Sequence, residues 1–326
     1  MSDLKGIKYP WLEPVARDLA DQCERGQLPH AILLHGPAGI GRRHLALWLC
    51  TRVLGAEPPD LAIAADPDAG LALTEELLHP DLLVAQPPPD KRALPIELVR
   101  QLIGFLQLTA HQGKSKTAVV APAEAMSHSA ANSLLKTLEE PPPGSLILLV
   151  TTAPGRLPAT VVSRCQRVRV GLPATGPAID WLRTAHGDAD WAGLLELAGG
   201  APLTALRLQA AGFGAEARRL EDELAALASA DAEPVTVARR WVKLGAPRCV
   251  DWLYRRTAAE IRARSLAGEN AGTGSLQNSP DLLNISRLHT MLRELGELRR
   301  LAGSGVNMEL ALAQLLDGWY GASAPR

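Results

Sequence analysis

The 326-residue chain has a formal net charge of −1, a hydrophobic content of 47% and a charged content of 21%. These values predict a globular protein of two or three domains and argue against strong DNA binding by the chain alone. The sequence has neither an apolar N-terminal signal nor an apolar run of about 18 residues, so we expect no membrane span and a cytoplasmic location. Cys23, Cys50, Cys165 and Cys249 form no Cys-x-x-Cys pair, so we expect reduced thiols rather than disulfides or a zinc site.

The first 172 residues alternate short apolar runs with amphipathic helical patterns. We expect strands over 31–34, 82–85, 117–121, 146–151 and 167–170, and helices over 13–25, 43–54, 96–109 and 130–138. Such alternation predicts an α/β domain, with a parallel five-stranded sheet and flanking helices, over residues 1–172. Residues 56–70 have no clear period and are expected to form a loop.

After residue 172 the strand pattern ends. Helices are expected over 178–184, 191–197, 202–211 and 215–227, which defines a small helical domain at 173–232. Further helices are expected over 235–244, 249–264, 285–301 and 308–319, which defines an all-α domain at 233–326. Residues 267–281 are rich in Gly, Asn and Ser, and this composition predicts a loop between helices.

A glycine-rich loop lies between the first predicted strand and the following helix. Residues 36–43 read Gly-Pro-Ala-Gly-Ile-Gly-Arg-Arg, whereas a phosphate-binding loop reads G-x-x-x-x-G-K-[ST]. Gly36, Gly39 and Gly41 preserve the loop, but Arg42 and Arg43 replace the Lys that contacts phosphate and the hydroxyl that binds Mg²⁺. Arginine has no acceptor atom and stays protonated, so it cannot bind the metal. We therefore expect no nucleotide here, and little effect of Arg42→Ala.

The strand expected to carry a metal-binding acid is altered as well. A phosphate-binding loop of this kind works with an acidic residue at the end of a neighbouring strand. Here the predicted strand ends in Ala121 and is followed by Pro122, neither of which binds metal or activates water. Glu124 comes later and is expected to point elsewhere. Loop and strand together predict a domain without nucleotide chemistry of its own.

A third motif, Ser163-Arg164-Cys165, follows the fourth predicted strand. An arginine at a domain surface can enter the ATP site of a neighbouring subunit and stabilise charge on the transferred phosphate. Taken alone, Arg164 is better explained as a solvated surface side chain. The small basic clusters, among them Lys114-Ser115-Lys116, are likewise expected to be solvated.

Together these motifs resemble the clamp-loader branch of the AAA+ ATPases. The resemblance rests on Leu28-Pro29-His30-Ala31, the loop 36–41, Leu134-Leu135-Lys136-Thr137-Leu138-Glu139-Glu140-Pro141-Pro142, and Val162-Ser163-Arg164-Cys165-Gln166. Tyr9-Pro10-Trp11-Leu12 and Gly305-Val306-Asn307-Met308-Glu309-Leu310 are similar to the two ends of the catalytically silent bacterial member. The resemblance implies an AAA+ sheet, a helical lid at 173–232 and a C-terminal helical collar, for oligomerisation, at 233–326.

The resemblance also implies a function. It implies a non-hydrolysing stator subunit of the DNA polymerase III clamp loader, without intrinsic activity but part of a DNA-directed DNA polymerase, a nucleotidyltransferase. The implied partners are gamma/tau and delta subunits in a hetero-pentamer that loads the beta sliding clamp onto primed DNA. Arg164 is then an arginine finger that acts in trans on the ATP of the adjacent gamma/tau subunit.

Two further cofactor positions differ from active members of the family. Leu203 stands where active members carry a lid arginine that touches phosphate, and only Cys50 remains of a four-cysteine zinc module. The resemblance therefore implies that the chain holds neither ATP nor zinc.

The helix predicted over 130–138 offers a possible contact with DNA. Backbone N–H groups in its first turn could meet a phosphate, and Ser127, Ser129, Asn132 and Lys136 could add contacts. Ordinary capping by Ser127 or Ser129, and a solvated Lys136, explain the same residues slightly better.

Two other functions remain open. The chain could be an active AAA+ ATPase subunit of the gamma/tau type, or a degenerate AAA+ regulator outside replication. ATP binding by the isolated chain separates the first of these from the silent subunit, and co-purification with gamma/tau and delta separates the second.

Overall fold

The computed structural model describes residues 4–55, 79–88, 91, 93–111, 115–270, 280–301 and 306–323. The chain divides into two compact units, Met1–Arg207 and Leu208–Arg326. The predicted loop 56–70 lies outside the described residues, and the division into three domains at 172 and 232 stays a prediction. Across the described ranges, no helix is both long and apolar enough to cross a membrane.

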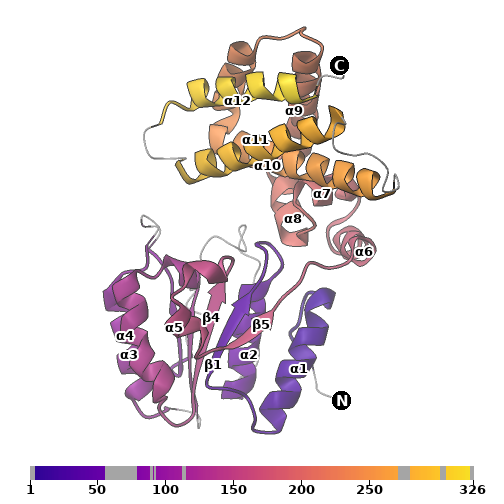
Figure 1. The fold of residues 1–326 in the computed structure, drawn as a ribbon. Coiled ribbons are helices and arrows are strands. Elements are labelled where there is room, and N and C mark those ends of the chain that lie inside the picture. Colours follow the sequence, from indigo (N-terminus) through magenta and orange to yellow (C-terminus); the bar gives the residue numbers. More distant parts are fainter. Residues whose placement is uncertain are drawn as a thin grey trace. The chain divides into compact units, whose positions relative to one another are not determined.

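The first unit contains a parallel sheet of five strands in the order β2-β3-β4-β1-β5 (Figure 1). The strands are β1 (Ala31–His35), β2 (Leu82–Ala85), β3 (Lys116–Val120), β4 (Ser145–Thr151) and β5 (Gln166–Arg169). The predicted parallel five-stranded sheet is confirmed. Because the strands are parallel, the carboxyl ends of β1, β3 and β4 meet at one edge, where the glycine-rich loop begins.

Helices cover both faces of this sheet (Figure 1). Ile32 and Leu34 of β1 pack in the core formed with α1 (Glu13–Glu24) and α2 (Arg42–Leu54), whereas Leu33 packs in the core formed with α3 (Ile96–Gln107) and α4 (His128–Glu139). Successive side chains of a strand point to opposite faces, so a strand that is apolar throughout is buried on both sides. This explains why the predicted strands read as continuous apolar runs.

The expectation that Lys116 is solvated is wrong. Lys116 is the first residue of β3, and its buried Nζ lies 3.1 Å from Oδ1 of the fully buried Asp81. The same Asp81 oxygen accepts a hydrogen bond of 2.7 Å from the backbone N–H of His111, and Lys116 Nζ lies 4.1 Å from the centre of the Phe105 ring. A buried cation needs a partner of this kind, and the partner lies too far away in the sequence for a local charge pattern to show it.

Three helices follow β5 within the first unit. They are α6 (Thr175–His186), α7 (Trp191–Leu197) and the first part of α8 (Pro202–Ala210). Ala201 and Leu203 belong to the same hydrophobic core as α1 and α2. The helices after the sheet are therefore packed onto the domain that carries the loop.

The second unit is helical, as predicted. It contains α9 (Phe213–Ala228), α10 (Pro234–Asn270), α11 (Pro280–Leu301) and α12 (Met308–Ser323). The predicted break between residues 244 and 249 appears as a kink at Gly245, whose φ of 114° is open mainly to glycine. The loop predicted over 267–281 is wrong for residues 267–270, which continue α10, and for 280–281, which begin α11; residues 271–279 lie outside the described ranges.

Trp241 of α10 anchors the core of the second unit. It is fully buried, its ring meets that of Trp252 edge-on at 5.6 Å, and its Nε1–H donates to Oε2 of Glu223 on α9 at 2.6 Å. A buried indole needs such an acceptor for its single donor. The pair thereby links α9 to the helices that follow it.

Candidate functional site

The glycine-rich loop connects β1 to α2, as the sequence predicts, and it is packed against its own chain. Gly39 has φ of 74° and Gly41 has φ of 87°, a region that side chains rarely adopt. A Cβ atom at Gly39 would lie 2.0 Å from Oγ1 of Thr204, and one at Gly41 would lie 2.6 Å from Cδ2 of Tyr9. Both glycines are therefore required by contacts with protein, whether or not a phosphate is present.

Arg42 is a buried structural residue, a role that sequence reasoning missed. Its side chain is only 6% exposed; Nε donates to the carbonyl oxygen of Pro37 at 3.1 Å, and Nη1 donates to the carbonyl oxygen of Thr151. Pro37 lies in the loop, and Thr151 is the last residue of β4. The guanidinium thus bridges the loop and the sheet at the position where an active family member presents its lysine to phosphate.

The first turn of α8 lies directly on the loop. The backbone N–H of Leu203 donates to the carbonyl oxygen of Gly39 at 3.0 Å, and the Leu203 side chain is almost completely buried. Leu203 is the residue at which the resemblance implies a lid arginine in active members, and its side chain belongs to the core.

A cluster of aromatic rings packs beside the loop, and sequence reasoning did not identify it as part of the site. Tyr9 stacks on Trp11 at 5.3 Å, and Trp181 of α6 meets both rings edge-on at 5.5 and 5.1 Å. Nε1 of Trp11 donates to the carbonyl oxygen of Ile40 at 2.8 Å, which ties the cluster to the loop. The available signal was the concentration of aromatic residues at 9–11 in a chain with only 4% aromatic residues.

His44 of α2 belongs to the same cluster and is held neutral. It meets the Tyr9 ring edge-on at 4.8 Å, and its Nε2 accepts a 3.2 Å hydrogen bond from the backbone N–H of Lys8. Burial, aided by the charge of Lys8, lowers the pKa of His44 from 6.5 to about 4. As the pH falls, His44 is protonated in the unfolded chain near pH 6.5 but in the folded chain only near pH 4. The stability that neutral His44 contributes is therefore complete above pH 6.5 and is lost as the pH falls toward 4.

We expect His44 to lower the free energy of unfolding by about 1.5 kcal/mol between pH 6.5 and pH 5. His44→Gln keeps an acceptor for Lys8 but cannot titrate in this range, so its decline should be smaller by that amount. Urea unfolding at the two pH values measures the difference. His128→Gln, at an exposed position on α4, is the control and should retain the full decline of the unsubstituted chain.

A pocket of about 230 Å³ adjoins the loop, and one acidic residue lines it. Its lining residues are Ala38, Arg42, Arg43, Pro122, Glu124, Val150 and Thr152. The expectation that Glu124 points elsewhere is therefore wrong: its Oε1 accepts hydrogen bonds from the backbone N–H and Oγ1 of Thr152, at 2.9 and 2.5 Å. Burial raises the pKa of Glu124, but hydrogen bonds from Thr152 and Thr151 outweigh burial and hold this pKa below its usual value. An ionised carboxylate thus lies beside the two loop arginines.

Ala121 and Pro122 directly follow β3, which ends at Val120, one residue earlier than predicted. Ala121 is buried, and its backbone N–H donates to the carbonyl oxygen of Ala85 at 3.0 Å. Neither side chain offers an atom that binds metal. Within the described parts of the chain, no group of three or more His, Cys, Asp or Glu side chains could hold a metal ion.

Arg164 lies at the surface of the first unit, between α5 (Ala159–Val162) and β5. Its side chain is 35% exposed; Nη1 donates to the carbonyl oxygen of Thr160 at 2.8 Å, and Nη2 lies 2.5 Å from Oε1 of Glu139. The neighbouring Cys165 is partly buried, which raises its thiol pKa to about 11 and keeps it protonated at neutral pH. The motif therefore presents a guanidinium and no reactive thiolate.

Three of the four candidate DNA contacts, Ser127, Ser129 and Asn132, lie in or next to the first two turns of α4, whereas Lys136 lies in its last turn. Ser127 is the N-cap and accepts from the backbone N–H of Ala130 at 3.2 Å, and its hydroxyl lies 3.0 Å from that of Ser129. Asn132 bonds to the His128 ring at 3.1 Å, and Lys136 is exposed. Capping accounts for Ser127, while a role of the four residues in DNA binding stays a prediction.

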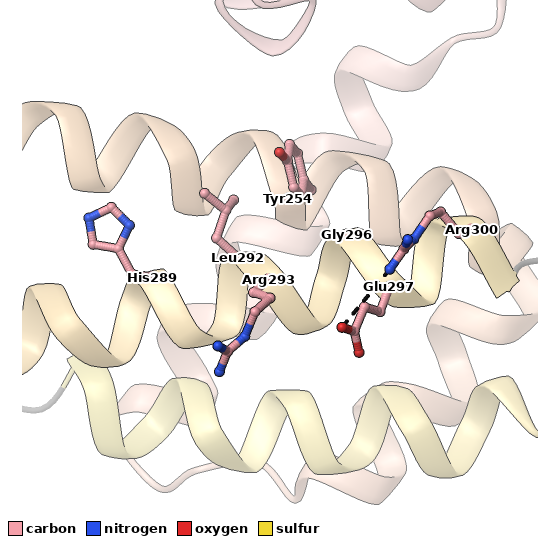
Figure 2. A pocket seen from close by; sticks show the side chains of 7 residues that line it. All are labelled: Tyr254, His289, Leu292, Arg293, Gly296, Glu297 and Arg300. Carbon is pink, nitrogen blue, oxygen red and sulfur yellow. Dashed lines mark ion pairs between the residues drawn. The ribbon is translucent and has the colours of Figure 1, made fainter. Parts of the chain in front are cut away.

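The second unit contains a groove of about 380 Å³ between α10 and α11 (Figure 2). Its lining residues are Tyr254, His289, Leu292, Arg293, Gly296, Glu297 and Arg300. A Cβ atom at Gly296 would lie 3.8 Å from Cε2 of Tyr254, and the guanidinium of Arg299 lies 4.6 Å from the centre of the Tyr254 ring. Arg293 and Arg300 bring two positive charges to the groove and Glu297 one negative charge, 3.9 Å from Arg300. The groove is therefore mainly cationic and only partly neutralised.

Comparison with known proteins identifies relatives of both the sequence and the fold. The family described as "DNA polymerase III, delta subunit" matches residues 11–172. The chain is 34% identical over 269 residues to DNA polymerase III subunit delta′ of Pseudomonas aeruginosa, covering 82% of this chain and 80% of that one. It is 29% identical over 316 residues to the Escherichia coli subunit of the same name, covering 94% of each chain.

Among solved structures, a DNA polymerase III gamma subunit-related protein from Thermotoga maritima aligns with a TM-score of 0.53. That alignment covers 96% of this chain and 99% of the other at 18% identity, so it informs on fold alone. The predicted fold, an AAA+ sheet with flanking helices followed by C-terminal helices, is confirmed.

Proposed function

Because the chain belongs to the delta′ family of DNA polymerase III subunits, we propose that it is the non-hydrolysing member of a clamp loader. The observation that carries this proposal is the placement of Arg42. Arg42 stands at the position of the phosphate-binding lysine. Its buried guanidinium donates to the carbonyl oxygens of Pro37 and Thr151 and is thus engaged by the protein itself. Three further positions support the proposal. Arg43 replaces the metal-binding hydroxyl, Ala121 replaces the metal-binding acid, and Leu203 replaces the lid arginine.

The proposed contribution to catalysis is made in trans. Arg164 is partly exposed on the first unit, and a guanidinium at such a place can stabilise charge on a phosphoryl group held by a neighbouring subunit. The family places ATP at interfaces between subunits, so the recipient is the ATP of an adjacent gamma/tau subunit. The chain then has no activity alone, and its contribution appears only in the complex.

The proposed partners are gamma/tau and delta subunits, assembled with this chain into a hetero-pentamer. The complex would load the beta sliding clamp onto primed DNA during replication. The helical second unit is the proposed collar, and its cationic groove between α10 and α11 supports a polar contact with a neighbouring subunit. The near-neutral net charge is consistent with DNA being reached through the complex.

We expect the purified chain to bind no ATP at micromolar concentration. The loop lacks the lysine, the hydroxyl and the lid arginine that hold a nucleotide. Leu203 and Arg42 bond instead to the carbonyl oxygens of Gly39 and Pro37 in the loop. Titration of a fluorescent ATP analogue in the presence of Mg²⁺ measures binding, with a gamma/tau subunit as the positive control. Saturable binding accompanied by phosphate release would establish the active-ATPase alternative instead.

One observation favours that alternative. The ionised Glu124 lines the pocket beside the loop and could contribute to a metal site there. Its Oε1 accepts both hydrogen bonds from Thr152 and is engaged within the protein, whereas its buried Oε2 accepts no hydrogen bond from the described residues and is the oxygen that a ligand could reach. If ATP binding is detected, Glu124→Gln becomes the variant that tests this residue as the metal ligand.

A test of partnership separates replication from any other role of a degenerate AAA+ protein. Co-expression of the tagged chain with its cognate gamma/tau and delta subunits should yield one complex that co-elutes in size-exclusion chromatography. Elution of the chain apart from both subunits would contradict the proposed function.

A further inference from the structure

The proposed arginine finger is held by a carboxylate of its own chain. Glu139 is the last residue of α4, and its Oε1 lies 2.5 Å from Nη2 of Arg164. A second anchor, the carbonyl oxygen of Thr160 in α5, accepts from Nη1 at 2.8 Å. Nη1 also lies 3.4 Å from Oγ of Ser163, so one ionised acceptor and two neutral ones hold the guanidinium against the domain that carries it.

We propose that Glu139 is a positioning residue that retains Arg164 on its own domain until the phosphates of a neighbouring subunit's ATP displace it. This inference rests on the proposed trans role of Arg164. It adds that the finger is engaged by exchange of one anion for another. A guanidinium presents its donors in a planar fork, and its bonds to Glu139 and Thr160 leave it no freedom to reach outward while both are kept.

The exposure of the pair makes the exchange feasible. The Arg164 and Glu139 side chains are 35% and 51% exposed, so solvent screens their attraction and the pair is weak compared with a buried one. A bound triphosphate carries several negative charges and accepts bidentate bonds from arginine. The Glu139 carboxylate can therefore hold Arg164 away from the neighbouring ATP when clamp and DNA are absent. It does not prevent Arg164 from reaching that ATP once the complex binds them.

The adjacent residue provides a matched control. Glu140 is exposed and carries the same charge at the next position, but within the described residues its side chain makes no bond to Arg164. Glu139→Gln and Glu140→Gln thus remove the same charge from the same surface. Only Glu139→Gln removes the ionic partner of Arg164, so a difference in ATP hydrolysis between the two variants measures the effect of the Glu139–Arg164 ion pair.

The test uses the complex reconstituted with cognate gamma/tau and delta subunits. We expect Glu139→Gln to raise ATP hydrolysis without clamp and DNA by about two- to fivefold, the range that a partly exposed ion pair allows. The rate with clamp and primed DNA, where the finger is already engaged, should be unchanged. The basal effect should shrink as salt is raised, because salt screens the pair, and Glu140→Gln should leave both rates unchanged.

Three other results are informative. A fall in both rates with Glu139→Gln would mean that the carboxylate supports the catalytic geometry and would overturn retention. Equal basal rates in Glu139→Gln and the unsubstituted complex, with Arg164→Ala still reducing hydrolysis, would overturn retention but preserve the trans finger. If Arg164→Ala has no effect on hydrolysis, the trans finger and the retention both fail. Thermal unfolding of each variant chain shows whether a loss of rate reflects a loss of folding.

Discussion

Replacing Arg164 with Ala is expected to slow ATP hydrolysis by the reconstituted complex and to impair clamp loading, while the chain folds and assembles normally. Arginine fingers supplied in trans contribute about 10³-fold or more to the rate at the site they enter. Arg164 is partly exposed, and its bonds are to Glu139 and Thr160 at the surface, so folding does not depend on it. Steady-state phosphate release and clamp loading onto primed DNA measure the two effects.

Arg156 provides the control for this experiment. It is an exposed arginine in the short 3-10 turn Pro154–Arg156, close in sequence to the motif. Arg156→Ala should leave hydrolysis and loading near their original values. Hydrolysis and loading that survive Arg164→Ala unchanged would remove the trans role from this chain.

Arg42→Met is expected to lower the free energy of unfolding of the chain by about 3 kcal/mol. Methionine fills most of the space of the arginine stem but donates no hydrogen bond, so the carbonyl oxygens of Pro37 and Thr151 lose a buried donor. The expected loss concerns stability; the sequence-based expectation that substitution of Arg42 leaves ATP hydrolysis little changed stays a prediction. Urea unfolding followed by tryptophan fluorescence measures the loss.

Arg17→Met makes the same chemical change on the exposed face of α1 and should alter stability by no more than about 0.5 kcal/mol. Complexes that do assemble with Arg42→Met should hydrolyse ATP at the usual rate, because on the proposed function this loop does not bind phosphate. A marked fall in hydrolysis per assembled complex would contradict the silent-loop proposal.

Much of the fold could be predicted because its signals are local. Apolar runs such as residues 146–151 lie in the middle of the sheet, and the Pro-Pro-Pro-Gly sequence after Glu140 marks the end of α4. The helix in the second unit was harder to delimit. Gly245 and Pro247 indicate a break, but packing continues α10 through a kink and extends it into the predicted loop.

The details of the site could not be predicted because they depend on partners distant in the sequence. Arg42 and Thr151 are separated by 109 positions, and Lys116 and Asp81 by 35. The sequence shows that a lysine was lost at the loop, but only the fold shows what its replacement bonds to. The retention of Arg164 by Glu139 is likewise absent from the motif pattern, since it depends on α4 and α5 lying together.

The hydrogen bond from Leu203 to Gly39 has a consequence for motion. In an ATP-hydrolysing protomer, the nucleotide bridges the sheet domain and the helical lid, so the angle between these two parts can change with the state of the nucleotide. Here the two are joined directly by backbone and by the fit of Gly39 against Thr204. We therefore expect the angle between these two parts not to change with bound nucleotide, so that ATP-driven motion of an assembled ring would originate in the neighbouring subunits.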